Sequence, residues 1–387
     1  MSGRPLRIAM IGARGVPATF GGVERHVEEI GSRLAARGHE VIVYARTNYV
    51  EERRDTWRGM SVRNLDTVDS KHLDAIVHSA KSTLAAMRAG VDVVHYHSTG
   101  PGLPSPLPRF ASRAKVVQTI HGRDSERAKW GRAAQLVLRT AEWTSARIPD
   151  ETVVVSKHLA EHYLRAYGRR ATWIPNGVDE PTVRPPAAIA ERWGLTTGSY
   201  LLFVGRLVPE KAPDLLMRAF RRLPGDLRLV IAGGSSFTDD YVTDLEREAA
   251  GDPRVVLAGY VFGDELDELY SNAAAFVLPS FLEGLPLTLL EAASYGTPVV
   301  ASDIPPHLEV IGADAPGHRL FPTGDEAALA EALRRATAET KVEREGAAAF
   351  RDEVLATYRW DAVADMTEAV YRRLVRAGRA GSGEPGP

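Results

Sequence analysis

The stretch Ala274-Ala-Phe-Val-Leu-Pro-Ser-Phe-Leu-Glu-Gly-Leu-Pro-Leu-Thr-Leu-Leu-Glu291 places two glutamates where a strand passes into a helix. The apolar run that opens it predicts a buried parallel strand, and the residues after it predict a helix from near Gly284 to near Gly296. Glu283 would then lie at the carboxyl end of the strand and at the positive end of the helix, where an anion docks. Glu291 lies about two turns further along, so both carboxylates can face one cleft. A helix-terminal charge plus a solvated surface glutamate is the alternative interpretation.

Length and composition limit the class of protein. The 387 residues favour two domains, and 44% apolar with 25% charged residues is typical of a globular chain. The sequence contains no cysteine, which excludes a disulfide framework, a zinc–thiolate site and a cysteine nucleophile. It has no apolar stretch long enough to cross a bilayer, and Met1–Arg7 is not a secretory signal, so we expect a cytoplasmic protein. A pI near 6.6 and the lack of a recognition motif disfavour nucleic acid as a partner.

Charge is divided unevenly along the chain. Residues 1–180 hold 27 basic and 19 acidic residues, a net charge of +8, and the remainder carries −10. A basic first half is suited to an anionic partner, such as a phospholipid surface or a phosphate-bearing substrate. Scattered solvated charge is the alternative explanation.

Strand and helix patterns alternate through both halves. A helix is predicted from Glu24 to Arg37, and helical stretches separate most of the apolar runs. The strands expected in the first half are Arg7–Gly12, Glu40–Ala45, Val91–His97, Lys115–Ile120 and Glu151–Ser156. Those expected in the second half are Tyr200–Gly205, Leu227–Ala232, Val255–Ala258, Ala275–Leu278 and Pro298–Ala301. This alternation predicts an α/β fold with doubly wound parallel sheets.

Segments rich in proline or glycine indicate the domain boundaries. The proline-containing stretch 181–186 predicts a linker between a domain over 1–180 and a second domain over 195–358. A last helix is predicted at 360–377, and the Gly- and Pro-rich tail 378–387 is expected to be disordered. Two sheets in series predict a cleft between domains, which is the usual place for a small-molecule site.

Several segments suit a nucleoside diphosphate sugar. The loop Gly12–Gly22 joins the first strand to the first helix, and the backbone N–H groups of Gly21 and Gly22 can approach a phosphate there. The loop is neither a dinucleotide-binding G-x-G-x-x-G nor a Walker A motif, and a tight structural turn is the alternative.

Arg206 and Lys211 follow the first strand of the second half, at the predicted carboxyl edge of its sheet. Two cations in this position can neutralise a departing diphosphate, although isolated surface cations are common. His121 follows the strand that ends at Ile120 and also lies at a sheet edge, where a structural histidine is the alternative.

In order and spacing, these motifs resemble the retaining glycosyltransferases of family four, which have the two-domain GT-B architecture. The resemblance covers nearly the whole chain and rests on Gly21-Gly-Val-Glu24, Gly38-His-Glu-Val41, His121-Gly122, Val155-Ser-Lys157, Pro175-Asn-Gly-Val-Asp179, Gly205-Arg206 to Lys211, and the Glu283/Glu291 pair. Gly12-Ala-Arg-Gly-Val-Pro17 and Arg127-Ala-Lys-Trp-Gly131 further resemble a subgroup that includes rhamnosyltransferases of surface polysaccharide assembly. The family implies two Rossmann-like domains facing a cleft, with the last helix crossing back onto the first domain.

The resemblance also implies a role for each motif. The diphosphate would be held by Gly21 and Gly22 from the first domain and by Arg206 and Lys211 from the second. Glu291 would accept hydrogen bonds from the ribose hydroxyls. Glu283 would contact the donor sugar, with the amides of Gly284 and Leu285 nearby and His121 on the other side of the sugar. The base would be flanked by Tyr260, Val261 and Phe262.

The expected catalytic residues are therefore His121, Glu283, Arg206 and Lys211. The two cations would stabilise the leaving diphosphate in place of a divalent metal, and we see no clustered aspartates that resemble a metal site. We thus expect a nucleotide diphosphate sugar as co-substrate, no cofactor and no metal. The resemblance implies retention of the anomeric configuration, for which we favour front-face attack; covalent participation of Glu283 stays open. Domain closure would exclude water.

The acceptor, a sugar, a glycolipid or a small molecule, is expected on the first domain. The segment Arg123–Arg147 mixes arginines and a lysine with tryptophans and aliphatic residues, which predicts contact with the inner face of a membrane or with a lipid-linked acceptor. A core-facing amphipathic helix with solvated arginines is the alternative. Two other functions are a nucleotide-sugar epimerase of the same architecture, which the glutamate and cation pairs argue against, and a non-catalytic binding protein.

Overall fold

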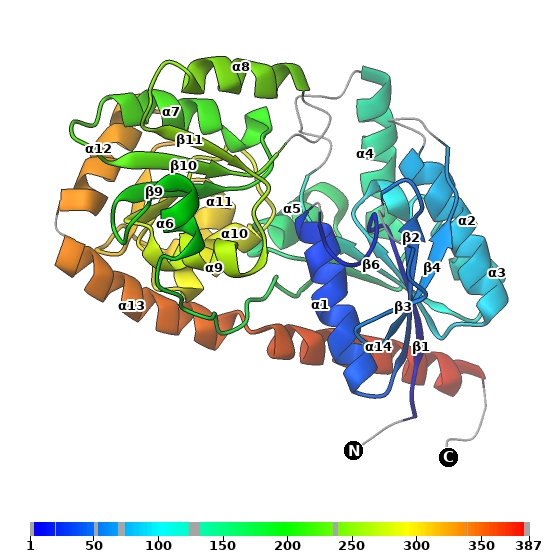
Figure 1. Ribbon diagram of the computed structural model, residues 1–387. Coiled ribbons are helices and arrows are strands. Elements are labelled where there is room, and N and C mark those ends of the chain that lie inside the picture. The colour runs from blue at the N-terminus through cyan, green and yellow to red at the C-terminus, as the bar shows by residue number, and fades with distance from the viewer. Residues whose placement is uncertain are drawn as a thin grey trace. The chain divides into compact units, whose positions relative to one another are not determined.

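The computed structural model describes residues 4–19, 21–49, 53–68, 74–123, 132–234, 239–338 and 340–382 (Figure 1). The chain forms two compact units. Unit 1 comprises Met1–Gly177 with Trp360–Pro387, and unit 2 comprises Val178–Arg359. Each unit contains its own parallel sheet with helical connections, which confirms the predicted doubly wound α/β class.

Unit 1 is built, within its described residues, on an eight-stranded sheet in the order β3-β4-β2-β1-β5-β6-β7-β8. Neighbouring strands are parallel except for β3 and β4, which form an antiparallel edge. The strands are β1 (Arg7–Ile11), β2 (Glu40–Arg46), β3 (Thr56–Trp57), β4 (Met60–Leu65), β5 (Val93–His97), β6 (Lys115–Ile120), β7 (Glu151–Val154) and β8 (Thr172–Trp173). The helices are α1 (Gly22–Ala36), α2 (Asp74–Ala89), η1 (Gly100–Gly102), α3 (Pro106–Ala111), α4 (Arg132–Arg147), α5 (Lys157–Tyr167) and α14 (Trp360–Ser382). Strand β5 is buried at every position, as expected for a central strand covered on both faces.

Helix α14 completes unit 1 although it is the last element of the chain. It packs against α1 and β6, and Figure 1 shows it running beside α1. The hydroxyl group of its buried Tyr371 is hydrogen-bonded to Nδ1 of His95 on β5. At its start, the indole of Trp360 lies so close to Gly177 that a Cβ on the glycine would come within 2.6 Å of the ring.

The end of α14 differs from the expectation. Gly378 to Ser382 were predicted to begin a disordered tail, but the helix continues to Ser382. Gly378 lies against the side chain of Lys115, where a Cβ would meet the lysine at 2.5 Å, so the absence of a side chain permits this contact. A single internal glycine costs a helix only about 1 kcal/mol, which such packing can offset. Residues 383–387 of the expected tail lie outside the described residues.

Unit 2 contains, within its described residues, a six-stranded sheet in the order β11-β10-β9-β12-β13-β14. Each of its strand pairs is parallel. The strands are β9 (Tyr200–Val204), β10 (Arg228–Ala232), β11 (Val255–Gly259), β12 (Ala275–Leu278), β13 (Val299–Ser302) and β14 (His318–Phe321). The helices are α6 (Ala188–Trp193), η3 (Pro209–Lys211), α7 (Pro213–Arg221), α8 (Asp239–Ala249), α9 (Gly263–Asn272), α10 (Leu287–Ser294), α11 (Pro305–Ile311), α12 (Glu326–Ala338) and α13 (Thr340–Thr357).

The stretch 181–186 is part of unit 2 and not a free linker. The backbone N–H of Arg184 donates to Oγ of Ser271 at 3.1 Å, and Nδ2 of Asn272 donates to the carbonyl of Arg184 at 2.8 Å. These bonds attach the stretch to α9. The proline content that predicted a linker carries no information about such contacts. The chain passes between units at Gly177–Val178 instead.

Helix α10 begins at Leu287, three residues later than predicted. Pro286 explains the difference, because a proline disfavours helical backbone in the residue before it. Glu283 consequently lies in the loop between β12 and α10 rather than at the first helical turn, whereas Glu291 lies in the middle of the helix.

Candidate active site

A lysine and a glutamate from neighbouring strand ends meet in unit 2. Strands β9 and β12 are paired in parallel, so the segments that follow them leave the sheet at the same edge. Lys211 ends η3 after β9, and Glu283 lies in the loop after β12. Nζ of Lys211 donates to Oε1 of Glu283 at 2.6 Å, and the two side chains are only 13% and 12% exposed. Ser280 donates to the same carboxylate oxygen at 2.8 Å, so the carboxylate is held from two sides.

This contact sets the charge of Glu283. Burial alone would raise the pKa of the carboxyl group, but the Lys211 ammonium and the Ser280 hydroxyl outweigh burial and hold the pKa below its ordinary value of 4.5. Glu283 is therefore ionised at neutral pH, where it accepts hydrogen bonds and cannot serve as a proton donor. Burial also lowers the pKa of nearby His307 to about 4, so this imidazole adds no charge at pH 7.

Glycines allow the backbone to crowd at the same edge of the sheet. Gly233 has a φ of +143°, and a Cβ there would lie 1.8 Å from the carbonyl oxygen of Gly205. A Cβ on Gly205 would lie 3.0 Å from Cδ of Lys211, and one on Gly234 would lie 2.3 Å from the ring of Tyr260. The missing side chains thus make room for the lysine and the tyrosine across the ends of β9 and β10.

Aromatic and cationic side chains flank this edge. Arg206 directly follows Gly205 and is partly buried. After β11, the rings of Tyr260 and Phe262 are 45% and 54% exposed and lie nearly parallel, with centroids 6.0 Å apart and planes 7° apart. Val261 between them is buried. Two exposed, aligned rings offer a flat apolar surface of the kind that a nucleobase contacts.

Glu291 is oriented by a tyrosine that the sequence analysis did not identify. The hydroxyl of Tyr270, on α9, donates to Oε2 of Glu291 at 3.1 Å. Tyr295 stacks on Tyr270 with a centroid distance of 5.3 Å, which fixes the donor ring. Gly284 and Leu285, named as neighbours of the sugar, are buried in the loop before α10.

In unit 1, Gly21 caps α1 and Gly22 is its first residue. The loop before them is held by carboxylates of α1: Glu24 accepts from the N–H of Arg14 at 3.0 Å, and Glu28 accepts from the N–H of Ala18 at 2.6 Å. These two loop amides already have anionic partners. A phosphate role for Gly21 and Gly22 stays a prediction.

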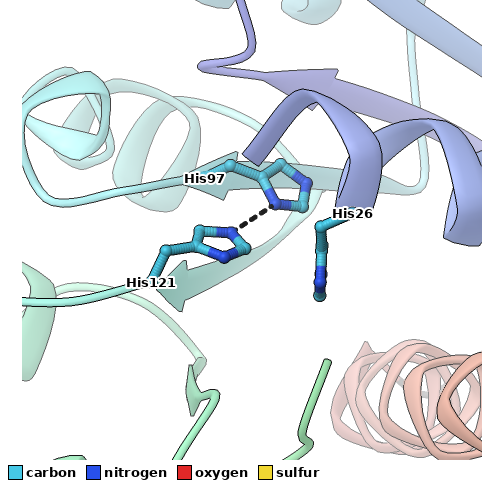
Figure 2. A group of neighbouring side chains, drawn as sticks. All are labelled: His26, His97 and His121. Atoms are coloured by element: carbon cyan, nitrogen blue, oxygen red, sulfur yellow. Dashed lines mark hydrogen bonds between the residues drawn. The ribbon is translucent and has the colours of Figure 1, made fainter. Parts of the chain in front are cut away.

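His121 lies after β6 beside two histidines that the sequence analysis did not connect with it (Figure 2). Its Nε2 is 3.3 Å from Nδ1 of His97, the last residue of β5, and its ring centroid is 4.6 Å from that of His26 on α1. Burial lowers the pKa of His26 to about 4 and lowers those of His97 and His121 well below the ordinary value. All three imidazoles are therefore neutral at pH 7.

Some of the site residues that were not predicted had a usable signal in the sequence, and others had none. Ser280 follows β12 by two positions and precedes Glu283 by three, so its place at the sheet edge was a usable signal. His97 ends a strand, as does the residue before His121, and adjacent parallel strands would bring the two together. Tyr270 carried no such signal, because its contact with Glu291 depends on how α9 packs beside α10.

Part of the predicted membrane-facing segment lies outside the described residues. These are positions 124–131, which include Arg127, Lys129 and Trp130. The described part is α4, whose Leu136, Val137 and Trp143 are 67%, 44% and 52% exposed. Across the described residues, every helix is too short or too polar to span a bilayer.

Two family models match the chain in succession. The family described as Glycosyltransferase Family 4 matches residues 20–180, and Glycosyl transferases group 1 matches residues 198–339. The D-inositol 3-phosphate glycosyltransferase of Acidothermus cellulolyticus is 31% identical over 78% of this chain and 76% of its own length. The glycogen synthase of Mycobacterium tuberculosis is 29% identical over 97% of this chain and 96% of its own length.

Solved structures share the fold. The sucrose-phosphate synthase from Thermosynechococcus elongatus superposes with a TM-score of 0.82 at 24% identity, covering 96% of this chain and all of that one. Anabaena HepE, solved in complex with UDP and glucose, superposes with a TM-score of 0.79 at 18% identity over 95% of this chain and all of that one. The architecture is therefore GT-B, and these matches do not favour the epimerase or the non-catalytic alternative.

Proposed function

This chain belongs to the family 4 glycosyltransferases, which use nucleotide sugars, and on that premise we propose that unit 2 binds the donor and that the sugar is transferred with retention of configuration. The observation that carries the proposal is the Lys211–Glu283 pair at the glycine-bordered edge of the unit 2 sheet. A carboxylate kept ionised by a buried lysine suits a ligand that bears both hydroxyl groups and phosphates.

The diphosphate is the part of the donor that Lys211 and Arg206 bind. In the chain without ligand, Lys211 is neutralised by Glu283 at 2.6 Å. An incoming diphosphate takes over part of that lysine's hydrogen bonding, and Glu283 then accepts hydrogen bonds from the sugar hydroxyls. The ammonium of lysine is a compact point charge, whereas the guanidinium of arginine can donate two hydrogen bonds to one phosphate. The two side chains together can therefore stabilise the negative charge that develops on the leaving group.

The nucleoside is the part that Glu291 and the aromatic pair bind. A carboxylate with one oxygen held by Tyr270 presents a fixed acceptor to vicinal ribose hydroxyls. Tyr260 and Phe262 then contact the base.

In the transfer step, the bond between the anomeric carbon and the leaving phosphate oxygen breaks while the acceptor oxygen bonds to the same face of that carbon. The acceptor proton passes to a leaving phosphate oxygen, so no protein acid is needed, which agrees with an ionised Glu283. Arg206 and Lys211 stabilise the developing negative charge in place of a divalent metal. The contact of His121 with the sugar and that of Gly21 and Gly22 with the diphosphate belong to this proposal through the family resemblance.

Nucleotide binding tests the donor assignment directly. We would record thermal midpoints with UDP, GDP, ADP and dTDP in the presence of EDTA, on the wild type, on Glu291→Ala and on Glu331→Ala as a control. Glu331 pairs with Arg334 on the surface of α12. One nucleotide at about 100 times its Kd should stabilise the wild type and the control by roughly 2.7 kcal/mol. Stabilisation of Glu291→Ala to the same extent would refute the ribose assignment.

Transfer itself is tested with the donor so identified. The anomeric coupling constant of the product, measured by NMR, should match that of the donor sugar, and turnover should persist in EDTA. An inverted product would refute retention, and loss of turnover in EDTA would refute metal independence.

We further propose that the acceptor is used at the cytoplasmic face of a membrane, in surface polysaccharide or glycolipid assembly. Support comes from α4, where Leu136 and Trp143 share an exposed face with Arg139 and Arg147. Apolar and aromatic tips among arginines suit an anionic lipid surface. The rhamnosyltransferase-like motifs at 12–17 and 127–131 support the same pathway class.

Vesicle sedimentation tests the membrane contact. The wild type should sediment with anionic vesicles at low salt, and Leu136→Ser with Trp143→Ser should abolish this. Leu164→Ser, at a leucine of α5 that is 50% exposed, is the control for removing an exposed apolar side chain. Absence of wild-type binding would refute the membrane contact and leave the donor site unaffected.

A further inference from the structure

Three histidine side chains from separate elements converge inside unit 1. His26 comes from α1, His97 from the end of β5 and His121 from the loop after β6 (Figure 2). One ring nitrogen from each lies within 4.8 Å of the others. His26 and His97 are buried and His121 is partly buried. We propose that these three imidazoles form a binding site for a divalent transition-metal ion of the zinc class.

The spacing of the first two nitrogens is that of a metal site. Nitrogen ligands lie about 2.0–2.1 Å from zinc at tetrahedral angles, which places two of them about 3.3–3.4 Å apart. Nδ1 of His97 and Nε2 of His121 are 3.3 Å apart. The distance between these two nitrogens is therefore already that of a shared ion, once the proton between them has moved to the other ring nitrogen of its histidine. A nitrogen of His26, within 4.8 Å of the other two, has to approach by about 1.5 Å.

The third ligand is already oriented by an outer partner. Nδ1 of His26 lies 2.9 Å from Oδ1 of Asn176. An amide oxygen only accepts hydrogen bonds, so Nδ1 carries the proton and Nε2 carries the lone pair. Histidines that bind metals characteristically donate their other ring N–H to such an oxygen, which fixes the tautomer and the ring orientation.

The adjacent His95 shows how a purely structural histidine is held in the same region. Both of its nitrogens are hydrogen-bonded, Nδ1 to the hydroxyl of Tyr371 and Nε2 to Oγ1 of Thr119 at 2.7 Å. His97 differs, because its buried Nε2 has no hydrogen-bond partner among the described residues. Within the described part of the chain, the hydrogen bond of His97 is made through Nδ1, the atom that lies against His121.

Three imidazoles leave a fourth tetrahedral position for water or for an oxygen of a bound ligand. Nitrogen ligands suit zinc, copper, nickel and iron better than magnesium or calcium, which prefer oxygen. One consequence rests on the proposed function: an ion on Nε2 of His121 would hold this ring away from the donor sugar, and zinc would therefore inhibit transfer.

Calorimetric titration of the full chain, stripped with EDTA and then desalted, tests the site with zinc as the probe. The wild type should bind one equivalent, and His97→Gln should weaken that binding at least about tenfold. Asn176→Ala should retain the site with roughly 10- to 100-fold lower affinity, because it removes only the outer partner. His78→Gln is the matched control, since His78 is equally buried but lies on α2 outside the cluster.

Equal zinc affinity of wild type and His97→Gln would overturn the proposal, as would a wild type that binds no zinc. If the variants do not fold, X-ray absorption of the cobalt-loaded wild type decides the question: three imidazole ligands support the site, and fewer than three overturn it. Binding is measured without donor or acceptor, so failure of the metal site leaves the proposed transfer reaction untouched. Zinc binding without inhibition would contradict only the assignment of His121 to the sugar.

Discussion

Replacing Lys211 by methionine isolates the electrostatics of the site. The substitution keeps an unbranched side chain that is one atom shorter, and it leaves Glu283 buried without its cation. Among the described residues, the Ser280 hydroxyl is then its hydrogen-bond partner. At 2.6 Å and an effective dielectric constant of about 20, Coulomb's law gives the pair about 6 kcal/mol, and desolvation of the two ions offsets most of this. Removing one partner of a buried pair costs about 3–5 kcal/mol, and the residual exposure of 12% places Lys211→Met near the lower end.

The expected loss is therefore about 3 kcal/mol at pH 7.5, or roughly 6–12 °C in the thermal midpoint of a unit of this size. Adding Glu283→Gln removes the stranded charge and should recover most of the loss, so the two substitutions couple strongly. Lys341→Met is the control, because Lys341 and Glu345 form an exposed pair at 3.8 Å and their separation should produce no measurable change.

The same variant has a signature in pH. The pKa of Glu283 is lowered in the folded wild type, so its stabilising contribution is fully present above pH 4.5 and is lost as the pH falls through the folded pKa. Without Lys211, burial is the dominant influence and raises that pKa, so the deficit of Lys211→Met should shrink from pH 8 to pH 5. Urea denaturation at both pH values measures this. A deficit below about 1 kcal/mol at pH 7.5, or no rescue by Glu283→Gln, would refute the reasoning.

Three further outcomes are expected. In Gly234→Ala the new Cβ would lie 2.3 Å from the ring of Tyr260 and would displace that ring. Nucleotide affinity should therefore fall while the thermal midpoint changes little. Unchanged affinity in a nucleotide titration would count against base contact by this tyrosine. Glu291→Gln keeps the size of the side chain and removes a charged acceptor, so the same titration should show about tenfold weaker nucleotide binding. Tyr371→Phe leaves Nδ1 of buried His95 without its partner and should lower the free energy of unfolding by about 1–3 kcal/mol, measured in urea; a loss of stability no larger than that of a surface substitution would argue against this bond.

The sequence predicted the interior of the fold better than its edges. Lys115–Ile120 and Ala275–Leu278 have the predicted bounds, and both strands are buried at every position except Lys115. Strands β4 and β14 were not predicted, since polar residues interrupt them and their pairing depends on neighbouring strands.

For the site, the position of a residue at a sheet edge could be predicted, but its contacts could not. Residues in the segments that follow strands, such as Lys211 and Glu283, could be assigned to one sheet edge because parallel strands all end there. The hydrogen bond between them, and the tyrosine beside Glu291, depend on rotamers and helix packing that no local pattern encodes. His26 is 95 residues from His121, and only the folded sheet brings helix α1 against the end of β6.

The path of the chain through α14 has a consequence for biosynthesis. Unit 2 is continuous, so it can become compact as soon as Arg359 has left the ribosome. Unit 1 is synthesised first, yet it waits for Trp360 and Tyr371, which arrive roughly 10–40 s later at ordinary translation rates. During that interval its faces over α1 and β6 are open to chaperones, and a premature stop near the 3′ end of the message would damage the N-terminal half of the enzyme rather than the C-terminal half.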